Sequence, residues 1–470
     1  MSSSYDVSIW AIDKYEGARK TTYRVRWAVA GRRFQETFDT RKLAESFRSK
    51  LLTAAREGVA FDERTGLPEP MARAKFSRSC YELACEYVEM KWPHSSARHR
   101  KSIADALATV MPALLSTDRG RPDDKTLRRA LYGWAFTKSS KRKDSDPEIS
   151  GALRWVAQNT LPVSDLEDPT VMRRALDRLA TTVNGQSAAP NTIARKRAVF
   201  SGMLLYGVEI GLLDRNPSTR VRWKTPKSTE AIDRRVVVNH EQYRRLKSAV
   251  RKVYPPLEAF YNCIYYAALR PAECVHLSEA DCKLPEEGWG ELLLTGSIQT
   301  VGEAWSDSGD AKEVRGLKHR ARNDTRIVPA CPDLVASLRR HIDTFGTGPN
   351  GRLFVNRAGR FGRPIAGPYS NPVSTNTQSR VWRKARGQAL NPSEAASPLA
   401  RRPYDLRHAC VSTWFNAGVP PTQIAEWAGQ SVEVLLRIYA KCISGQTDTA
   451  LRRIEDALKI DDVSGLDGTA

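Results

Sequence analysis

The chain has 470 residues, enough for two to four domains, and 41% of them are hydrophobic, as in a soluble globular protein. It has no run of about 18 apolar residues and no basic N-terminal segment followed by an apolar one, so it predicts neither a membrane span nor a secretory signal. Lys and Arg number 74 against 53 for Asp and Glu, and the net charge of +21 favours a polyanion such as nucleic acid as partner.

The cysteines and histidines point away from metal chemistry. The chain has eight cysteines and seven histidines. The cysteines show no C-x-x-C spacing and the histidines no H-x-x-x-H spacing, so we expect free thiols in a reducing compartment and no zinc site. No cofactor is predicted.

Residues 1–60 have the pattern of a small β-rich module. Apolar and basic residues alternate over 22–27, which is the period of a half-exposed strand, and further candidate strands lie at 7–11 and 34–38. Thr40 suits the N-cap of a following helix. Three strands and a helix resemble the arm-binding modules of integrases, whose sheet enters a major groove and would present Arg24, Arg26, Arg32 and Arg33. A small scaffold with basic decoration is the alternative.

Residues 75–217 have helical periodicity and predict a helical domain. Its end at 211–217 reads G-L-x-x-x-N-P and resembles that of the core-binding, SAM-like domain of integrases. Its last helix carries the candidate DNA contacts Arg195, Lys196 and Arg197. The polar, basic stretch 218–235 predicts a linker, and it adds Arg222 and Lys224 to these contacts. An α+β domain is predicted over 236–460 and a disordered tail over 461–470, so the whole fold is multidomain and mainly α with an α+β part.

The stretch 403–439 carries the most information about function. Arg407 begins one predicted helix, and Tyr439 lies inside a later one, with glycine-containing turns between the helices. The stretch resembles the C-terminal box of the tyrosine recombinases, or phage integrases, which reads H-x-L-R-H, x-x-A-G, L-G-H-S and then a lone tyrosine. The sequence around Arg407 and Tyr439 is most similar to that of actinobacterial mobile-element integrases. The matching positions are Arg407, Gly418, Gly429, Ser431 and Tyr439.

Two positions depart from the family box. Tyr404 stands where the family has histidine, and Gln430 stands where it has histidine or tryptophan. A phenol is a poor base at neutral pH, but both side chains can donate a hydrogen bond to a phosphate oxygen, so we retain both as site residues. His408 directly follows Arg407 and is expected to point to another side of the helix, so we do not assign it as the base.

Further residues match the family upstream. Arg270 lies in A-L-R-P-A-E, which resembles the first arginine box, and Glu273 is placed to hold a neighbouring basic group. A β-hairpin is predicted over 316–329, with its turn at 323–324 and its return strand at 326–329. The family carries a catalytic lysine on this hairpin, and Lys318 is the candidate.

The resemblance implies a strand-transfer chemistry. Tyr439 would attack a DNA phosphate and form a covalent 3'-phosphotyrosine, while Arg270 and Arg407 clamp the non-bridging oxygens and Lys318 protonates the leaving alkoxide. It also implies a cytoplasmic, nucleoid-associated prokaryotic enzyme that integrates or excises a mobile element. The chain would be a monomer without DNA and a homotetramer on paired attachment sites, with a directionality factor or a DNA-bending protein as further partners.

Alternatives remain open from the sequence alone. A type IB-like topoisomerase uses the same residue types without site preference. A DNA-binding remnant, inactivated through Tyr404 and Gln430, is a non-enzyme reading. Taken singly, Tyr439 also fits a core aromatic residue, and the Arg270 motif also fits an ordinary salt-bridged surface helix.

Overall fold

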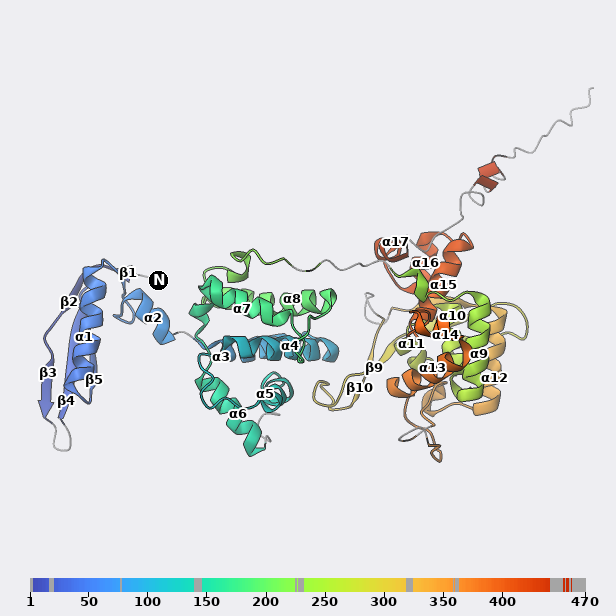
Figure 1. Cartoon of the computed structure of the whole chain (residues 1–470), viewed down its shortest axis with the longest axis horizontal. Coiled ribbons are helices and arrows are strands. Elements are labelled where there is room, and N and C mark those ends of the chain that lie inside the picture. Colours follow the sequence, from blue (N-terminus) through green and yellow to red (C-terminus); the bar gives the residue numbers. More distant parts are fainter. Residues whose placement is uncertain are drawn as a thin grey trace, which may run out of the picture. The chain divides into compact units, whose positions relative to one another are not determined.

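The computed structural model describes residues 3–16, 21–76, 78–138, 146–224, 226, 232–317, 324–357, 359, 363–439, 451–452, 454–455 and 458. It divides into two compact units, Met1–Lys227 and Ser228–Ala470 (Figure 1). Helices predominate and the strands form small sheets, so the predicted fold class is confirmed. None of the helices in these ranges is long and apolar enough to cross a membrane. The predicted tail, 461–470, lies outside the described residues.

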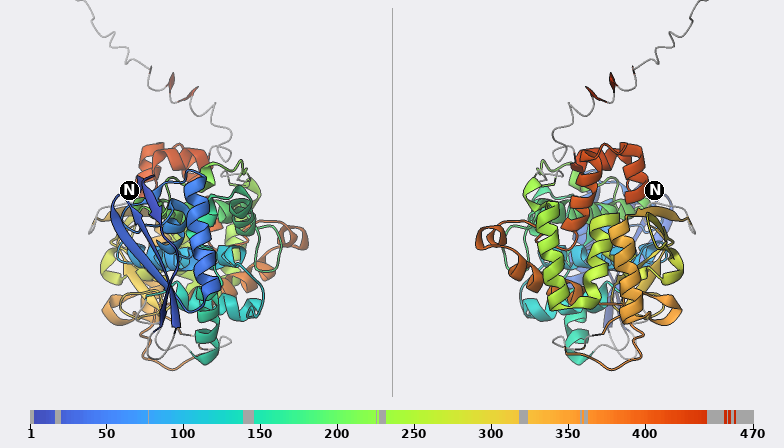
Figure 2. Two further views of the ribbon diagram at one scale, coloured as in Figure 1. Left: turned by 90° about the vertical axis from the view of Figure 1, so that its left-hand side faces the viewer. Right: turned by 90° about the vertical axis from the view of Figure 1, so that its right-hand side faces the viewer.

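The N-terminal sheet is built on strand β4 (Thr21–Val29), which pairs with β5 (Arg32–Phe38) on one side. On its other side, β2 (Val7–Ile9) and β3 (Asp13–Glu16) pair with successive parts of β4. The strand predicted over 7–11 is present as β2, whereas β3 is a further strand that the sequence pattern did not predict. Helix α1 (Arg41–Arg56) covers one face of this sheet (Figure 2). Apolar residues of β4 are buried there with those of α1. Arginines of the same strand lie on the opposite face, as the alternation predicts.

The rest of the first unit is mostly helical. A short pair, β1 (Ser3–Ser4) with β6 (Phe61–Asp62), precedes α2 (Glu69–Phe76). Buried leucine, alanine and valine side chains then hold a set of helices together. These helices are α3 (Cys80–Lys91), α4 (Ala97–Val110), α5 (Asp124–Ala130), α6 (Pro147–Gln158), α7 (Pro169–Leu179) and α8 (Pro190–Glu209).

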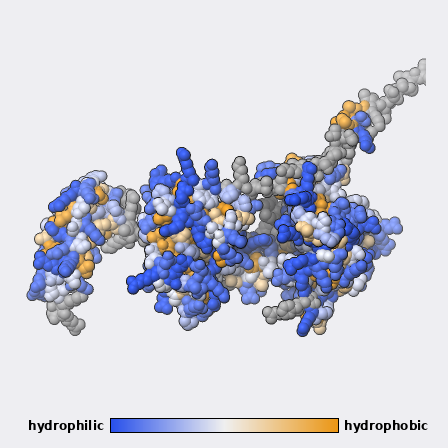
Figure 3. All heavy atoms as spheres, in the orientation of Figure 1, coloured by the Kyte–Doolittle hydropathy of each residue, from blue (hydrophilic) through white to orange (hydrophobic). Residues whose placement is uncertain are grey.

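The second unit combines helices with a three-stranded antiparallel sheet, in the order β11 (Arg326–Ala330), β8 (Gly290–Leu294), β7 (Cys282–Lys283). One large hydrophobic core joins this sheet to the helices around it. These helices are α9 (His240–Val253), α10 (Glu258–Ala267), α11 (Pro271–His276), α12 (Pro332–Phe345), α13 (Thr375–Ala389) and α14 (Pro392–Ala396). Figure 3 shows that the visible surface of both units is largely hydrophilic.

The predicted β-hairpin over 316–329 is only partly correct. The return strand exists as β11, but it pairs with β8, while β10 (Lys312–Arg315) pairs with β9 (Ser297–Thr300). The physical reason is burial, because alternate residues of β11 and of β8 are buried, and this pairing places them on the same inner face. Residues 318–323, which include most of the predicted incoming strand and the first residue of the predicted turn at 323–324, lie outside the described residues.

Three C-terminal helices complete the second unit: α15 (Asp405–Asn416), α16 (Pro421–Ala428) and α17 (Val432–Tyr439). Helix α15 lies between two cores, because Leu406 and Ala409 belong to the large core while Val411 and Phe415 belong to a second one. A helix that is buried on opposite sides holds its polar side chains rigidly, and Arg407 is one of them.

Candidate active site

Arg270 is positioned by the turn between α10 and α11. Its backbone N–H donates to Glu273 Oε2 at 2.8 Å, and its Nη1 donates to Glu273 Oε1 at 2.7 Å. The guanidinium also donates from Nη2 to the carbonyl oxygen of Gly429 at 2.6 Å, which joins α11 to the end of α16. About a fifth of the side chain remains exposed, at 18%, so Arg270 is the accessible cation of this cluster.

Glu273 is shared between two arginines. Its Oε2 also accepts a hydrogen bond of 2.8 Å from Arg326 Nη2, which forms a second ion pair. The side chains of Glu273 and Arg326 are both almost fully buried. Burial by itself raises the pKa of this carboxyl, but the guanidiniums of Arg326, Arg270 and Arg407 outweigh it and lower the pKa to about 2. Glu273 is therefore a carboxylate at neutral pH.

Arg407 adds a third guanidinium from α15. It is fully buried, and its Nη1 and Nη2 donate to the carbonyl oxygens of Ala268 and Ala428. Its Nε is buried without a hydrogen-bond partner, and no carboxylate pairs with it among the residues the structure describes. Three guanidiniums with one carboxylate leave a local excess of positive charge, which suits an anionic phosphate.

Gly429 allows these arginines to approach one another. It ends α16 in the left-handed conformation, with φ +63°. A Cβ at this position would lie 2.0 Å from Arg326 Nη1 and 3.3 Å from Arg270 Nη1. Only a residue without a side chain fits between the two guanidiniums and the backbone.

Tyr439 lies at the C-terminal end of α17 and is fully buried in the second core. Its hydroxyl oxygen is 2.9 Å from His408 Nδ1, and its ring lies beside that of Phe415. Burial, followed by the charges of Arg407 and Arg402, lowers the pKa of His408 to about 4. The imidazole is therefore neutral at pH 7, and its Nδ1 can accept the hydroxyl proton.

His408 is the residue that sequence reasoning missed. It does point to a different side of α15 from Arg407, but that side faces Tyr439. The signal was helical spacing, because His408, Val411 and Phe415 recur along one side of α15, and Val411 and Phe415 belong to the core that holds Tyr439.

The two departures from the family box also lie in this region. The ring of Tyr404 is half-buried, 5.2 Å from the imidazole of His408, with the guanidinium of Arg407 6.0 Å from its centre. The amide oxygen of Gln430 is buried without a hydrogen-bond partner. The structure thus gathers Arg270, Arg407, Tyr404, Gln430 and Tyr439 through contacts among α11, α15, α16 and α17. Lys318 lies outside the described residues.

The site is closed in this structure. Neither Tyr439 nor Arg407 has measurable exposed surface. A phosphate reaches them only if neighbouring residues move, and α17 is the short element that carries the tyrosine. Its residue Ile438 accepts a hydrogen bond from the backbone N–H of Ile232 at 3.2 Å, so the chain that precedes α9 is attached beside Tyr439.

The predicted DNA contacts of the N-terminal module separate into two groups. Arg24, Arg26 and Arg33 lie on the sheet face opposite α1, whereas Arg32 pairs across from buried Val29 at the strand end. Arg26 forms an ion pair of 2.5 Å with Asp13 on that open face. The open face therefore carries an excess of arginines.

Lys196 is a correction among the predicted contacts. On α8 it shares the inward side with Ile193 and Phe200, and all three are buried. Its ammonium donates to Thr109 Oγ1 at 2.8 Å and lies 3.6 Å from Asp105, so it is a structural cation. Exposed cations in this part of the chain are Arg195, Arg222 and Lys224, whereas Arg197 is half-buried against Trp223.

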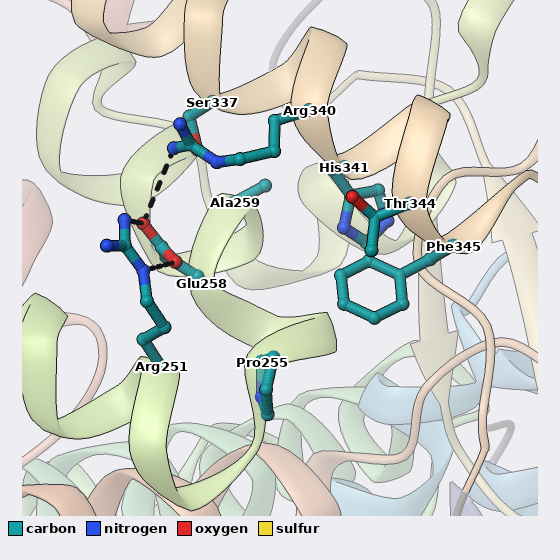
Figure 4. A pocket seen from close by; sticks show the side chains of 9 residues that line it. All are labelled: Arg251, Pro255, Glu258, Ala259, Ser337, Arg340, His341, Thr344 and Phe345. Carbon is teal, nitrogen blue, oxygen red and sulfur yellow. Dashed lines mark hydrogen bonds and ion pairs between the residues drawn. The ribbon is translucent and has the colours of Figure 1, made fainter.

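A cavity of about 280 Å³ lies elsewhere in the second unit, beside α10 and α12 (Figure 4). Glu258 on its wall accepts two hydrogen bonds of 2.6 Å from Arg251, and Arg340 lies 3.7 Å away. None of the residues predicted for catalysis lines it. No group of His, Cys, Asp and Glu in the described ranges could hold a metal ion.

Comparisons with known proteins give structural likenesses only. No family model matches the chain, and no curated protein sequence matches it. The Tn1549 transposon integrase in complex with circular intermediate DNA has a TM-score of 0.43 at 15% identity, over 67% of this chain and 96% of that one. The XerH site-specific recombinase bound to difH substrate gives 0.40 at 12% identity, over 77% and 95%.

A third similar structure is a lambda integrase tetramer bound to a Holliday junction, with a TM-score of 0.42 at 14% identity, over 89% of this chain and 95% of that one. These TM-scores lie below 0.5 and these identities below 25%. The functional conclusion therefore depends on the site geometry.

Replacing Gly429 with alanine tests the close approach of the arginines. Gly58, which follows α1 with φ +68° and the same pattern of two cap hydrogen bonds but has open space where its Cβ would be, is a matched control. We expect Gly58→Ala to cost about 1 kcal/mol for the left-handed backbone, and Gly429→Ala to cost about 1–3 kcal/mol more because its methyl group displaces Arg326. Urea unfolding measures both, and equal costs would contradict the packing described.

The low pKa of His408 predicts a pH dependence. The folded pKa is about 4 against 6.5 for a free imidazole, so the folded state binds fewer protons between these values. The free energy of unfolding therefore falls as the pH drops from about 6.5 towards 4, by at most about 3 kcal/mol. Urea unfolding at several pH values should show this loss, and His408→Gln should lack it. An unchanged slope in that variant would show that His408 titrates normally.

Proposed function

We propose that the chain is a tyrosine-type site-specific DNA recombinase that integrates or excises a mobile element. The observation that carries this proposal is the neighbourhood of α15, where the Arg270–Glu273–Arg407 cluster and the His408–Tyr439 pair meet on one helix. Attack on a phosphodiester needs a nucleophile with a proton acceptor and cations that stabilise the phosphate, and this site combines a tyrosine hydroxyl, an imidazole and guanidiniums.

Tyr439 is the nucleophile of this proposal. Its oxygen forms a bond to phosphorus, the bond to the 5' oxygen of the next nucleotide breaks, and the enzyme keeps the 3'-phosphoryl group as a phosphotyrosine. The hydroxyl proton moves to Nδ1 of His408, which is neutral at pH 7. One ester replaces another, so the bond energy is stored for rejoining.

The guanidiniums stabilise the transition state. Charge accumulates on the non-bridging oxygens, where Arg270 and Arg407 supply planar donors, and one such arginine is worth about 10³-fold in rate by analogy with other phosphoryl transfers. Tyr404 and Gln430 supply neutral donors beside them. Lys318 protonates the leaving oxygen.

Attack requires the closed site to open. Tyr439 is buried, and the hydrogen bond from Ile232 to Ile438 attaches the predicted interdomain linker beside it. When DNA binding moves this linker, the end of α17 moves with it and exposes the hydroxyl. A closed resting site also limits cleavage away from attachment sites.

DNA contact extends beyond the active site. The open face of the N-terminal sheet presents Arg24, Arg26 and Arg33 to the attachment-site DNA, and Arg222 and Lys224 lie exposed after α8. Such contacts neutralise phosphates and make the affinity strongly dependent on salt.

Assembly into a homotetramer is supported by exposed apolar residues and by a partly apolar cavity in the second unit. Leu451, Ile454 and Leu458 follow at helical spacing and are exposed by 52%, 54% and 71%. A cavity of about 550 Å³ lies between residues 234–240 and α15, and it is lined in part by Val237, Val238, Ala409 and Ala417. We assign this cavity to the C-terminal helical residues of a second copy.

Trapping on a nicked suicide duplex that carries the attachment site tests the chemistry. The parent chain should form a covalent protein–DNA adduct that Tyr439→Phe abolishes, because the phenol oxygen is the nucleophile. His408→Gln should slow adduct formation by about tenfold or more, since its amide is a far weaker proton acceptor. An adduct of equal yield in the Phe variant would refute the proposal. No adduct from the parent would favour the DNA-binding remnant, and relaxation without site preference would favour the topoisomerase.

Replacing the exposed C-terminal apolar residues tests the assembly. We expect Leu451→Ser combined with Leu458→Ser to keep adduct formation on a single duplex but to lose joining of two duplexes, because the docking surface is gone. Leu205→Ser, on α8 with a similar exposure of 54%, is the matched control. Native mass spectrometry with DNA counts the protomers, and an intact tetramer in the double variant would exclude this docking.

A further inference from the structure

Arg326 is a cation of the active site to which the proposed chemistry assigns no role. It begins β11, and its side chain is only 1% exposed. Its Nη2 donates to Glu273 Oε2, while its Nη1 lies where a Cβ of Gly429 would be, at 2.0 Å. It therefore touches both partners of Arg270, which are the carboxylate of Glu273 and the turn at Gly429.

Pairing, more than burial, separates Arg326 from the two clamping arginines. Arg326 and Arg407 are both buried, but Arg407 donates to backbone carbonyl oxygens, so its charge stays available to a phosphate, while the charge of Arg326 is paired with Glu273. Arg270 is the exposed member, at 18%. We therefore assign to Arg326 an effect that passes through the groups it contacts. Its charge is also needed there, because Glu273 is buried, and a buried carboxylate is costly unless it is paired.

The two carboxylate oxygens of Glu273 have different hydrogen-bond partners. Oε1 accepts from the Arg270 side chain, and Oε2 accepts from both the Arg270 backbone and Arg326. Arg326 thereby fixes the rotation of the carboxylate about its last bond. The orientation of the Arg270 guanidinium follows from that rotation, because its Nη1 is bonded to Oε1.

We propose that Arg326 is a positioning residue, which orients the phosphate clamp Arg270 by holding Glu273 and the backbone turn at Gly429. This inference rests on the proposed recombinase function. It predicts that loss of Arg326 lowers the rate of strand cleavage far more than it weakens DNA binding, because DNA affinity is spread over many phosphate contacts.

Loss of the Arg326 charge also changes the protonation of Glu273. Burial raises the pKa of Glu273, and Arg326 is the largest of the opposing influences. Without it the pKa moves upward, and Glu273 becomes protonated at a higher pH. A protonated Glu273 no longer pairs with the charge of Arg270, so the acid limb of the cleavage rate should move to higher pH.

Single-turnover cleavage of the suicide duplex, measured against DNA concentration and pH, tests this inference. The variants are Arg326→Met, which removes the charge, and Arg326→Lys, which keeps it without the planar fork. The matched control is Arg386→Met on α13, because Arg386 is a half-buried arginine that donates to the carbonyl oxygens of Leu399 and Ala395.

We expect Arg326→Met to lower the maximal rate about tenfold or more, with less than about threefold change in the half-saturating DNA concentration. We also expect it to shift the acid limb of the pH–rate profile to higher pH. Arg326→Lys should recover part of the rate and return the acid limb towards the parent value. Arg386→Met should change neither. If Arg326→Met does not fold, an Arg326→Lys enzyme with a parental rate and a parental acid limb overturns the inference.

Other outcomes separate this inference from the proposed function. Equal behaviour of Arg326→Met and Arg386→Met overturns the positioning role while the recombinase stands. A proportional loss of rate and DNA affinity in Arg326→Met also overturns it, since that indicates general destabilisation. No adduct from the parent chain refutes the recombinase itself.

Discussion

Glu273 is the carboxylate around which three guanidiniums of the second unit are arranged, and the rest of the candidate site depends on this charge balance. Arg270 and Arg326 bond to it directly, and Arg407 lies near enough to lower its pKa. Without the carboxylate, the buried arginines would repel one another. With it, the cluster still keeps an excess of positive charge, which can stabilise the negative charge on the phosphate oxygens in the transition state of phosphotyrosine formation.

The position of the nucleophile Tyr439 depends on hydrophobic packing and not on charge pairing. Helix α15 is packed between two hydrophobic cores, so it presents Arg407 to the charge cluster on one side and His408 to Tyr439 on the other. One rigid helix thus sets the clamp and the proton acceptor at once. Because both Arg407 and Tyr439 are buried, the same packing that aligns the groups also keeps them from solvent.

Local pattern reasoning succeeded where the signal is periodic. The β-rich start, the helical middle and the α+β end follow from alternation and helical spacing, and Thr40 does cap α1. It failed where the partner is distant in the chain. Strand β11 pairs with β8, which lies far earlier in the chain, and Lys196 faces Asp105 across the helical domain. Both errors arise because burial, and not sequence proximity, selects the partner.

The sequence by itself determined which chemistry is available, because tyrosine, arginine and their order along the chain are properties of the residues. It also determined local backbone features, such as the left-handed glycine that ends α16 at Gly429. Only the tertiary structure decided that His408 reaches Tyr439, that Arg326 shares Glu273, and that the site is closed. These relations join residues on different elements, and their distances are set by how the cores pack.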